Sequence, residues 1–265
     1  MTTITLPVPQ RTVTGRRQTQ LIFIGRSLRH SLRQVDALVM GIALPVILML
    51  LFVYIFGRAI DPSGGYVNYV VPGIILLCAG FGAAGTAVGV AEDMTNGVID
   101  RFRTMPITSS TVITGHVVAS LVRNLVTTAV VIMVALLVGF RPSAGLFEWL
   151  GALGLVSLWI LAITWLFAAL GLVADSAEAA GNYGFALLFL PYLSSAFVPI
   201  ETLPTWLRGF AQHQPITPVI ETIRGLLVGS TVGPVAFWAL GWCLLIIAVA
   251  MVWAGWLFRR RAGSR

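Results

Sequence analysis

The feature that most constrains this chain is a series of six long apolar runs, with charges almost only near their ends. A helix needs about 20 apolar residues to cross a bilayer core, because each residue rises about 1.5 Å. The runs lie at about 37–57, 67–91, 112–140, 149–173, 182–200 and 235–258. Hydrophobic residues make up 57% of the chain and charged residues only 10%. The sequence therefore predicts an all-α membrane protein with six transmembrane helices.

The placement of arginine predicts how these helices are oriented. Six spans put both termini on the same side of the membrane. The positive-inside rule then assigns the side with more arginine in its segments to the cytoplasm. The terminal side would hold Arg11, Arg16, Arg17, Arg26, Arg29, Arg33, Arg101, Arg103, Arg259, Arg260, Arg261 and Arg265. The opposite side would hold Arg58, Arg141, Arg208 and Arg224. By the positive-inside rule we expect both termini to be cytoplasmic in a multi-pass plasma-membrane protein.

We expect three parts along the chain: a cytoplasmic tail at 1–36, a six-helix transmembrane domain at 37–258 and a basic cytoplasmic tail at 259–265. The first part contains an amphipathic pattern that predicts an interfacial helix on the membrane surface. Its apolar face holds Leu21, Ile24, Leu28, Leu32 and Val35, and its basic face holds Arg26, Arg29 and Arg33. This helix could be a simple anchor or a contact for a partner, and the pattern fits both.

The chain contains no lysine, which bears on how it could be powered. The phosphate-binding loop G-x-x-x-x-G-K-[ST] places a lysine ammonium beside the β/γ-phosphates. If ATP drives this protein, another chain must bind the ATP and magnesium. We find no convincing catalytic set, metal site or disulfide framework, and Cys78 and Cys243 both fall inside predicted spans. The arginines flank apolar segments, so membrane lipid explains them better than nucleic acid does.

The loop between the second and third runs, about 92–111, is the most densely charged part of the transmembrane domain. It begins EDMTNGVIDRFRTMP, from Glu92 to Pro106. A short helix here could insert Val98, Phe102 and Met105 into a groove on a cytoplasmic protein while its charges fix the register. Pro106 would end that helix. The alternative interpretation is a solvated loop whose charges only orient the membrane helices.

Two parts of the sequence resemble the ABC-2 type permeases, particularly their daunorubicin/doxorubicin-resistance branch. The first runs from Gly89 to Pro106 and contains Glu92-Asp93, Asn96-Gly97, Ile99-Asp100-Arg101-Phe102-Arg103 and Met105-Pro106. The second contains Pro199, Pro204-x-Trp206-Leu207, His213-Gln214-Pro215 and Arg224-Gly225. The resemblance covers essentially the whole chain, and the cytoplasmic motif is the more specific part.

This resemblance implies a six-helix half of an ATP-binding-cassette exporter in a bacterial plasma membrane. In that family two permease chains pair as a homodimer or related heterodimer, and each contacts a separate ATPase subunit. The residues we expect to couple this chain to the ATPase are Glu92, Asp93, Asp100, Arg101, Phe102 and Arg103. Phe102 would be the apolar anchor. The substrates would be hydrophobic or amphipathic compounds, either drugs or cell-envelope lipids.

Arg123 and Asn124 lie inside the third run, where a central arginine costs at least about 2.5 kcal/mol unless it snorkels or pairs. One interpretation has Arg123 reach the cytoplasmic surface or pair with one of the acidic residues Glu92, Asp93, Asp175 and Glu178. The other makes Arg123 and Asn124 a polar contact in a substrate path. His116 has Ser120 one turn away but no orienting acid, so we expect an interfacial histidine and not a catalytic one.

Glycines in the second run spell G-x-G-x-x-G at Gly80, Gly82 and Gly85, but no strand precedes them. A dinucleotide site is therefore excluded by context. Gly85 and Gly89 also form G-x-x-x-G, within a stripe of small residues along which another helix can pack closely. We expect helix packing, either within one subunit or between two.

The segment 201–234 would be external and is too interrupted to cross the membrane. It predicts two short helices that re-enter the membrane from its external side before the last span. The residues we expect at an external gate are Pro204, Trp206, His213 and Pro215. An interfacial lid anchored by Trp206 fits the sequence equally well.

The leading functional prediction is the permease of an ATP-driven exporter, and the alternative is an ion- or proton-coupled secondary carrier. Such carriers usually place acidic residues or broken helices at mid-membrane, whereas the acidic residues here lie at span ends. Pro45 and Pro191 are the hints of a broken helix.

Overall fold

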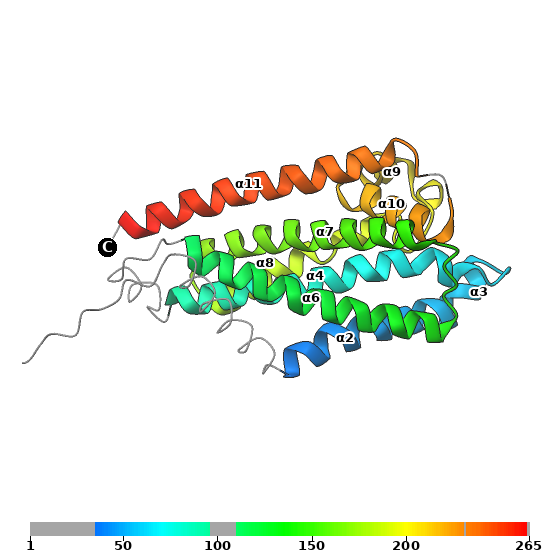
Figure 1. The fold of residues 1–265 in the computed structure, drawn as a ribbon, viewed down its shortest axis with the longest axis horizontal. Helices are drawn as coiled ribbons and strands as arrows, with labels where there is room; N and C mark the ends of the chain where they lie inside the picture. The colour runs from blue at the N-terminus through cyan, green and yellow to red at the C-terminus, as the bar shows by residue number, and fades with distance from the viewer. Residues whose placement is uncertain (1–34, 96–109, 231, 264–265) are drawn as a thin grey trace, which may run out of the picture.

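The computed structural model describes residues 35–95, 110–230 and 232–263, which form helices joined by short connections (Figure 1). The long helices are α2 (Val35–Leu50), α4 (Tyr66–Thr95), α6 (Ser110–Val138), α7 (Leu146–Val173) and α11 (Val235–Gly263). A π-helical segment, η1 (Leu51–Phe56), and α3 (Gly57–Ile60) continue α2. The shorter elements are α8 (Ala177–Leu187), the 3₁₀ turns η2 (Leu190–Leu193) and η3 (Ile200–Thr202), α9 (Thr205–His213) and α10 (Ile216–Val228). The all-α prediction is confirmed.

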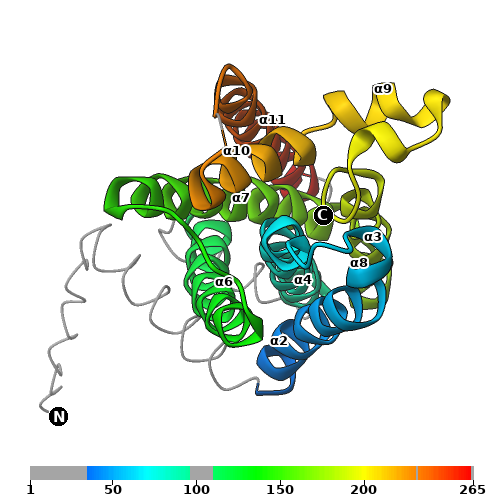
Figure 2. The same ribbon diagram turned by 90° about the vertical axis from the view of Figure 1, so that its right-hand side faces the viewer.

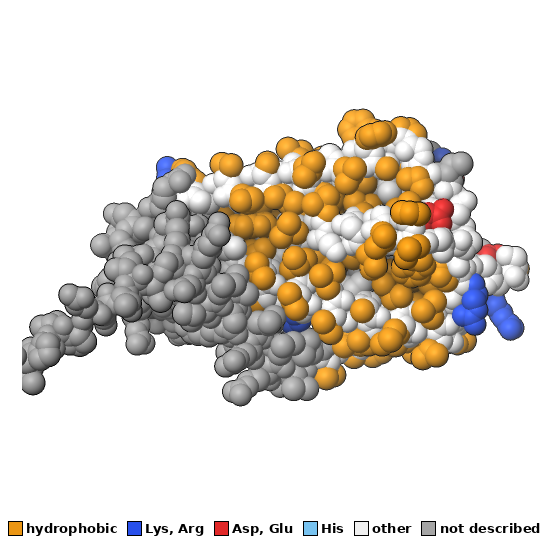
Figure 3. Space-filling view, in the orientation of Figure 1, with side chains coloured by type: hydrophobic (Ala, Val, Ile, Leu, Met, Phe, Trp, Pro, Cys, Tyr) orange, Lys and Arg blue, Asp and Glu red, His pale blue; other side chains and the backbone are white. Residues whose placement is uncertain are grey.

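Helix α4 lies at the centre of the bundle, surrounded by α2, α6, α7 and α8, while α11 lies behind α7 (Figure 2). One end of the bundle carries α3, α9 and α10, and we call it the distal end (Figure 1). At the opposite, proximal end α4 stops and α6 begins. Hydrophobic side chains cover much of the described surface between these ends (Figure 3). Such a surface suits contact with lipid tails.

Five helical stretches in the described part of the chain are long and apolar enough to cross a membrane. They are Gly41–Ile60, Tyr66–Thr95, Ile113–Val138, Leu146–Val173 and Val235–Leu257. They match the first, second, third, fourth and sixth predicted runs to within a few residues. The prediction of a continuous fifth transmembrane helix at 182–200 is wrong, because α8 ends at Leu187 and only a 3₁₀ turn and irregular turns follow.

The helix is interrupted here for local reasons. Pro191 has no backbone N–H, so it cannot supply the hydrogen bond that would continue the helix from α8. Three residues later, Ser194 donates its hydroxyl to the carbonyl oxygen of Pro191 at 2.5 Å and accepts the N–H of Ala196 at 3.1 Å. A serine side chain that bonds its own backbone competes with helix formation.

The interrupted segment, residues 177–197, nevertheless runs along most of the length of α4. Gly184 lies against Ala84, and further on Ala196 lies against Gly73 so closely that a Cβ on Gly73 would be 2.7 Å from the Ala196 carbonyl oxygen. At its distal end the carbonyl oxygen of Phe197 accepts the hydroxyl of Tyr66 at 2.8 Å. The segment therefore passes from the proximal to the distal end as a short helix followed by turns.

The two short helices predicted within 201–234 are present as α9 and α10. Helix α9 is largely exposed, whereas nearly all side chains of α10 are buried against α4, α7 and α11. With 13 residues, α10 is about 20 Å long, which is too short to cross a bilayer core.

Candidate transport and coupling site

Small residues on α4 form the surface on which polar residues of α6 lie. A Cβ on Gly82 would overlap Asn124 Oδ1, and a Cβ on Gly85 would lie 3.2 Å from Arg123 Nη2. Polar side chains can approach a neighbouring helix this closely only where its own side chains are absent. The structure thus confirms the helix-packing interpretation of the glycine stripe, and the partner is α6 of the same chain.

Arg123 is folded onto α4 near the middle of α6. It is 9% exposed, and its Nη2 donates a hydrogen bond to the carbonyl oxygen of Gly82 at 2.9 Å. A bond of this kind offsets part of the cost of an arginine within a membrane helix. The contact provides a partner of the kind that a structural role requires. The alternative hypothesis, a polar contact in a substrate path, rests on a cavity between α2, α4 and α6 that Arg123 lines.

Asn124 is fully buried in the same helix contact. Its Nδ2 donates to Ser120 Oγ at 3.4 Å, and Thr86 Oγ1 on α4 donates to the same oxygen at 2.7 Å. Asn124 Oδ1 has no hydrogen-bond partner among the residues that the structure describes. A polar chain of Thr86, Ser120 and Asn124 therefore crosses an otherwise apolar interface, with one acceptor left over.

Arg123 and Asn124 line a cavity of ≈ 410 Å³ between α2, α4 and α6. Gly41 on α2 and Gly82 on α4 form part of its wall. Its polar lining residues are Arg123, Asn124, Thr127 and, toward the proximal end, Glu92. The cavity therefore offers both charged and apolar surface at the depth of the membrane spans, as a site for part of an amphipathic molecule would.

The close contact between Gly82 and Asn124 can be tested by a double-mutant cycle. We expect Gly82→Ala alone to destabilise the chain by about 1–3 kcal/mol, because the added methyl displaces the Asn124 amide from a packed interface. In an Asn124→Ala background the same change should cost much less, which gives a coupling energy of about 0.5–3 kcal/mol. The measurement is thermal unfolding of the purified chain in detergent.

The matched control is Gly41→Ala, because a Cβ at Gly41 meets nothing within 4 Å although Gly41 lines the same cavity. Additive costs of Gly82→Ala and Asn124→Ala would contradict the packing described here.

At the proximal end, a contact between a histidine and a carboxylate joins the last turn of α4 to the beginning of α6. His116 Nε2 and Asp93 Oδ2 are 2.8 Å apart, and both side chains are partly exposed. Glu92 is exposed beside them. His116 is partly exposed, as expected of an interfacial residue, but the expectation that no acid orients it is wrong, because Asp93 contacts its ring. The other predicted coupling residues, Asp100, Arg101, Phe102 and Arg103, lie outside the described residues.

The four predicted gate residues lie at the distal end but do not converge. Pro204 precedes α9, Trp206 is 80% exposed on its outer face, and His213 Nδ1 contacts the carbonyl oxygen of Gly209 at 2.8 Å. Pro215 is different, because it precedes α10 and lines an internal apolar cavity. Their role as a gate stays a prediction.

Arg224 on α10 organises the distal end, a role that the sequence analysis missed. It is 8% exposed, and its Nε and Nη2 both donate to the carbonyl oxygen of Tyr69 on α4, at 3.2 and 3.0 Å. Nη2 also donates to the carbonyl oxygen of Ser195 at 2.8 Å, and Nη1 pairs with Glu221 at 2.6 Å. One side chain thus ties α10 to α4 and to the interrupted segment.

A sequence signal for this role exists. Arg224 follows Ile220 by four residues and precedes Leu227 by three, so it shares the apolar face of a short helix. A charged residue on a buried face must find partners, and the backbone carbonyls of Tyr69 and Ser195 supply them.

Comparison with known proteins relates the whole region from before α2 to the end of α10 to one family. The model of the ABC-2 type transporter family matches residues 18–228. The chain is 28% identical to the daunorubicin resistance ABC transporter permease protein DrrB1 of Streptomyces coeruleorubidus, over 88% of this chain and 84% of the relative. It is 26% identical to the probable doxorubicin resistance ABC transporter permease protein DrrC of Mycobacterium tuberculosis, over 88% and 85%.

A more distant similarity, 22% identity, links 72% of the chain to 27% of the ABC transporter G family member 20 of Dictyostelium discoideum.

Proposed function

Because this chain belongs to the ABC-2 type transporter family, we propose that it forms the membrane path of an ATP-driven exporter for hydrophobic or amphipathic compounds. The chain is a multi-pass membrane permease subunit related to drug-resistance exporters. The observation that carries the proposal is similarity to two drug-resistance permeases over most of the length of this chain and of each relative. Drugs and cell-envelope lipids are the two substrate classes we propose.

The proposed power source is a separate ATPase subunit that binds ATP and magnesium. The absence of lysine in this chain supports this, because the phosphate-binding loop depends on that residue. The proposed docking segment is 92–111, and the pair of Asp93 with His116 fastens together the two helices that flank it. A movement of this segment caused by the ATPase would therefore displace α4 and α6 together.

The proposed orientation places the proximal end of the bundle, with both termini, in the cytoplasm and the distal helices α9 and α10 outside. The arginine distribution supports this orientation. The interrupted segment from α8 to Phe197 would be the fifth of six crossings, since it follows α4 from one end to the other. Two such chains would pair to form the complete path.

The cavity between α2, α4 and α6 supports amphipathic cargo in particular. Its wall joins apolar groups such as Phe81 and Val88 with the guanidinium of Arg123 and the amide of Asn124. Asn124 Oδ1 has no hydrogen-bond partner among the described residues, and a purely apolar molecule would leave it without compensation in a medium of low dielectric constant.

The alternative is a secondary carrier, and the interrupted crossing is the observation that favours it. Against it, the acidic residues of the candidate spans in the described chain, Glu92, Asp93 and Glu148, all lie within the first or last few residues of their helices. Coupling to protons usually uses an acid deep within the membrane.

Inside-out membrane vesicles that contain the chain and its native partners distinguish the two functions. We expect uptake of doxorubicin, the compound in the name of the Mycobacterium tuberculosis relative, to require ATP and to persist when an ionophore collapses the proton gradient. Vesicles with a non-hydrolysable ATP analogue are the control. Uptake driven by an imposed gradient without ATP would support the carrier and overturn the exporter.

A further inference from the structure

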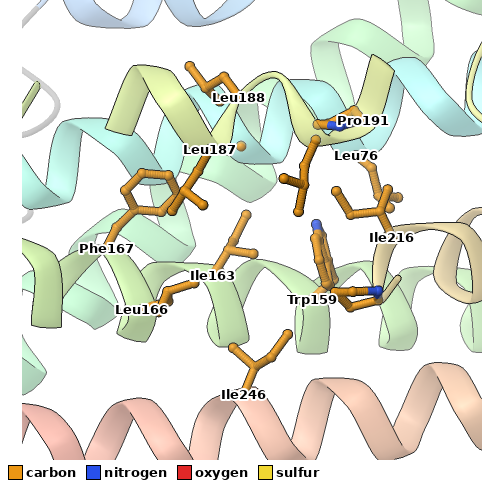
Figure 4. Close-up of a pocket in the computed structure, with 13 residues that line it drawn as sticks. Leu76, Trp159, Ile163, Leu166, Phe167, Leu187, Leu188, Pro191, Ile216 and Ile246 are labelled. Atoms are coloured by element: carbon orange, nitrogen blue, oxygen red, sulfur yellow. The ribbon is translucent and has the colours of Figure 1, made fainter. Parts of the chain in front are cut away.

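A second cavity, of ≈ 80 Å³, lies on the opposite side of α4 from the one described above, between α4, α7 and α11 (Figure 4). Its remaining walls come from the interrupted crossing and from the beginning of α10. Several elements meet there, since the lining residues include Leu76 from α4, Ile163 from α7, Pro191 from η2, Ile216 from α10 and Ile246 from α11. The cavity thus lies where the helix of the fifth crossing is broken.

Trp159 is the residue that gives this cavity its chemistry. The side chain is 5% exposed, and its Nε1–H has no hydrogen-bond partner within the described chain. Figure 4 shows the indole rising from α7 into the space between Ile163 and Ile216, with its nitrogen toward η2. A buried donor without an acceptor is unfavourable, and more so in a membrane protein, where water is scarce.

Water is a poor occupant of this space. An ordered internal water typically has two to four polar partners, whereas apolar cavities stay dry. Apart from Trp159, the lining residues are leucine, isoleucine, phenylalanine, proline and glycine, which have no polar side-chain atoms. A water here would find the indole N–H and little else.

The size of the cavity limits the occupant further. An apolar cavity of about 150 Å³ holds a benzene molecule, so the present volume suits roughly three or four heavy atoms. Trp159 follows Leu146, the first residue of α7, by roughly 20 Å along the helix axis, which is near mid-membrane. The group that enters must therefore belong to a molecule that partitions into the bilayer.

We propose that this cavity binds the short, acceptor-bearing end of a lipophilic compound, such as a ketone or ester group, and that Trp159 Nε1–H donates the hydrogen bond that selects it. An occupant would touch the broken crossing and the start of α10 at the same time, so binding would stabilise their contact. The role of this binding in transport rests on the proposed exporter function, whereas the binding itself does not.

The test is nuclear magnetic resonance of the full chain in lipid nanodiscs, with ¹⁵N-labelled tryptophan and ¹³C-labelled isoleucine methyl groups. The chain has eight tryptophans, and Trp159→Phe assigns the relevant indole signal by its disappearance. The probes are 2-hexanone and 2-methyl-1-hexene, which have similar shapes but differ in that only the ketone accepts a hydrogen bond.

We expect the ketone to shift the Trp159 indole proton downfield and the alkene to leave it nearly unchanged. The methyl signals of Ile163, Ile216 and Ile246 report occupancy in every variant. Trp159→Phe should weaken ketone binding by about tenfold, the effect of removing the donor from a buried hydrogen bond. Trp165→Phe, on the same helix but outside the cavity lining, should leave ketone binding unchanged.

Equal shifts with both probes, an unchanged Trp159 indole signal, or equal ketone affinity in Trp159→Phe would overturn the proposal. None of these measurements uses ATP, so they do not depend on the outcome of the vesicle experiment. A bound ketone in a chain that shows no ATP-driven uptake would overturn the exporter alone.

Discussion

Arg101→Glu is expected to abolish ATP-driven export while leaving the chain folded and inserted in the membrane. The residue belongs to the charged segment that we propose as the docking surface for the ATPase. Removing one partner of a buried charge pair across an interface costs about 2–5 kcal/mol, so a reversal should lower export by about 30-fold or more. The measurement is vesicle uptake together with ATPase activity, at matched amounts of the chain in the membrane.

Arg260→Glu is the matched control for this charge reversal. Arg260 is an exposed arginine at the proximal end of α11, and its guanidinium carbon lies 4.1 Å from the centre of the Trp256 ring. It lies outside the proposed docking segment, so export should be nearly normal. Undiminished export from normally expressed Arg101→Glu would count against the proposed coupling contact.

Gly171→Ala is expected to produce the largest loss of stability among single-methyl changes in the membrane helices. A Cβ at Gly171 on α7 would overlap the carbonyl oxygen of Ala87 and lie 3.0 Å from Val90 Cβ on α4. Backbone cannot rotate away as a side chain can, so the two helices must separate. We expect a cost of about 3 kcal/mol, which corresponds to a decrease of roughly 6–12 °C in the unfolding temperature.

Gly154→Ala on the same helix is the control, because a Cβ there meets nothing within 4 Å. It should be neutral or slightly stabilising, since alanine favours a helix more than glycine does. Similar unfolding temperatures for the two variants in detergent would show that the contact between α4 and α7 is looser than the structure indicates.

The sequence predicted five of the long membrane helices because length and apolarity are local properties that can be counted. The same criterion failed at 182–200, since apolarity does not reveal whether a run is one continuous helix. The signals for a break were present in Pro191 and in the Ser194-Ser195 pair, which can bond its own backbone. The high hydropathy of the surrounding residues outweighed them in the prediction.

Packing features that depend on residue size and spacing within one helix could be predicted from the sequence. The small-residue stripe on α4 correctly indicated helix packing, and Arg123 and Asn124 were identified as unusual in a membrane helix. Long-range partners could not be predicted. Nothing local indicates that Arg224 would reach Tyr69 or that the indole N–H of Trp159 would lack an acceptor. Both facts depend on how distant helices meet.

The central claim is that this permease works with a separate ATPase, and affinity purification of the tagged chain from its native membranes tests it most directly. Proteins that co-purify would be identified, and ATPase activity would be assayed in lipid. We expect a stoichiometric ATPase subunit that is retained by Arg260→Glu and lost from Arg101→Glu. The absence of any ATPase from the purified wild-type complex, with transport that survives ATP depletion, would contradict the claim.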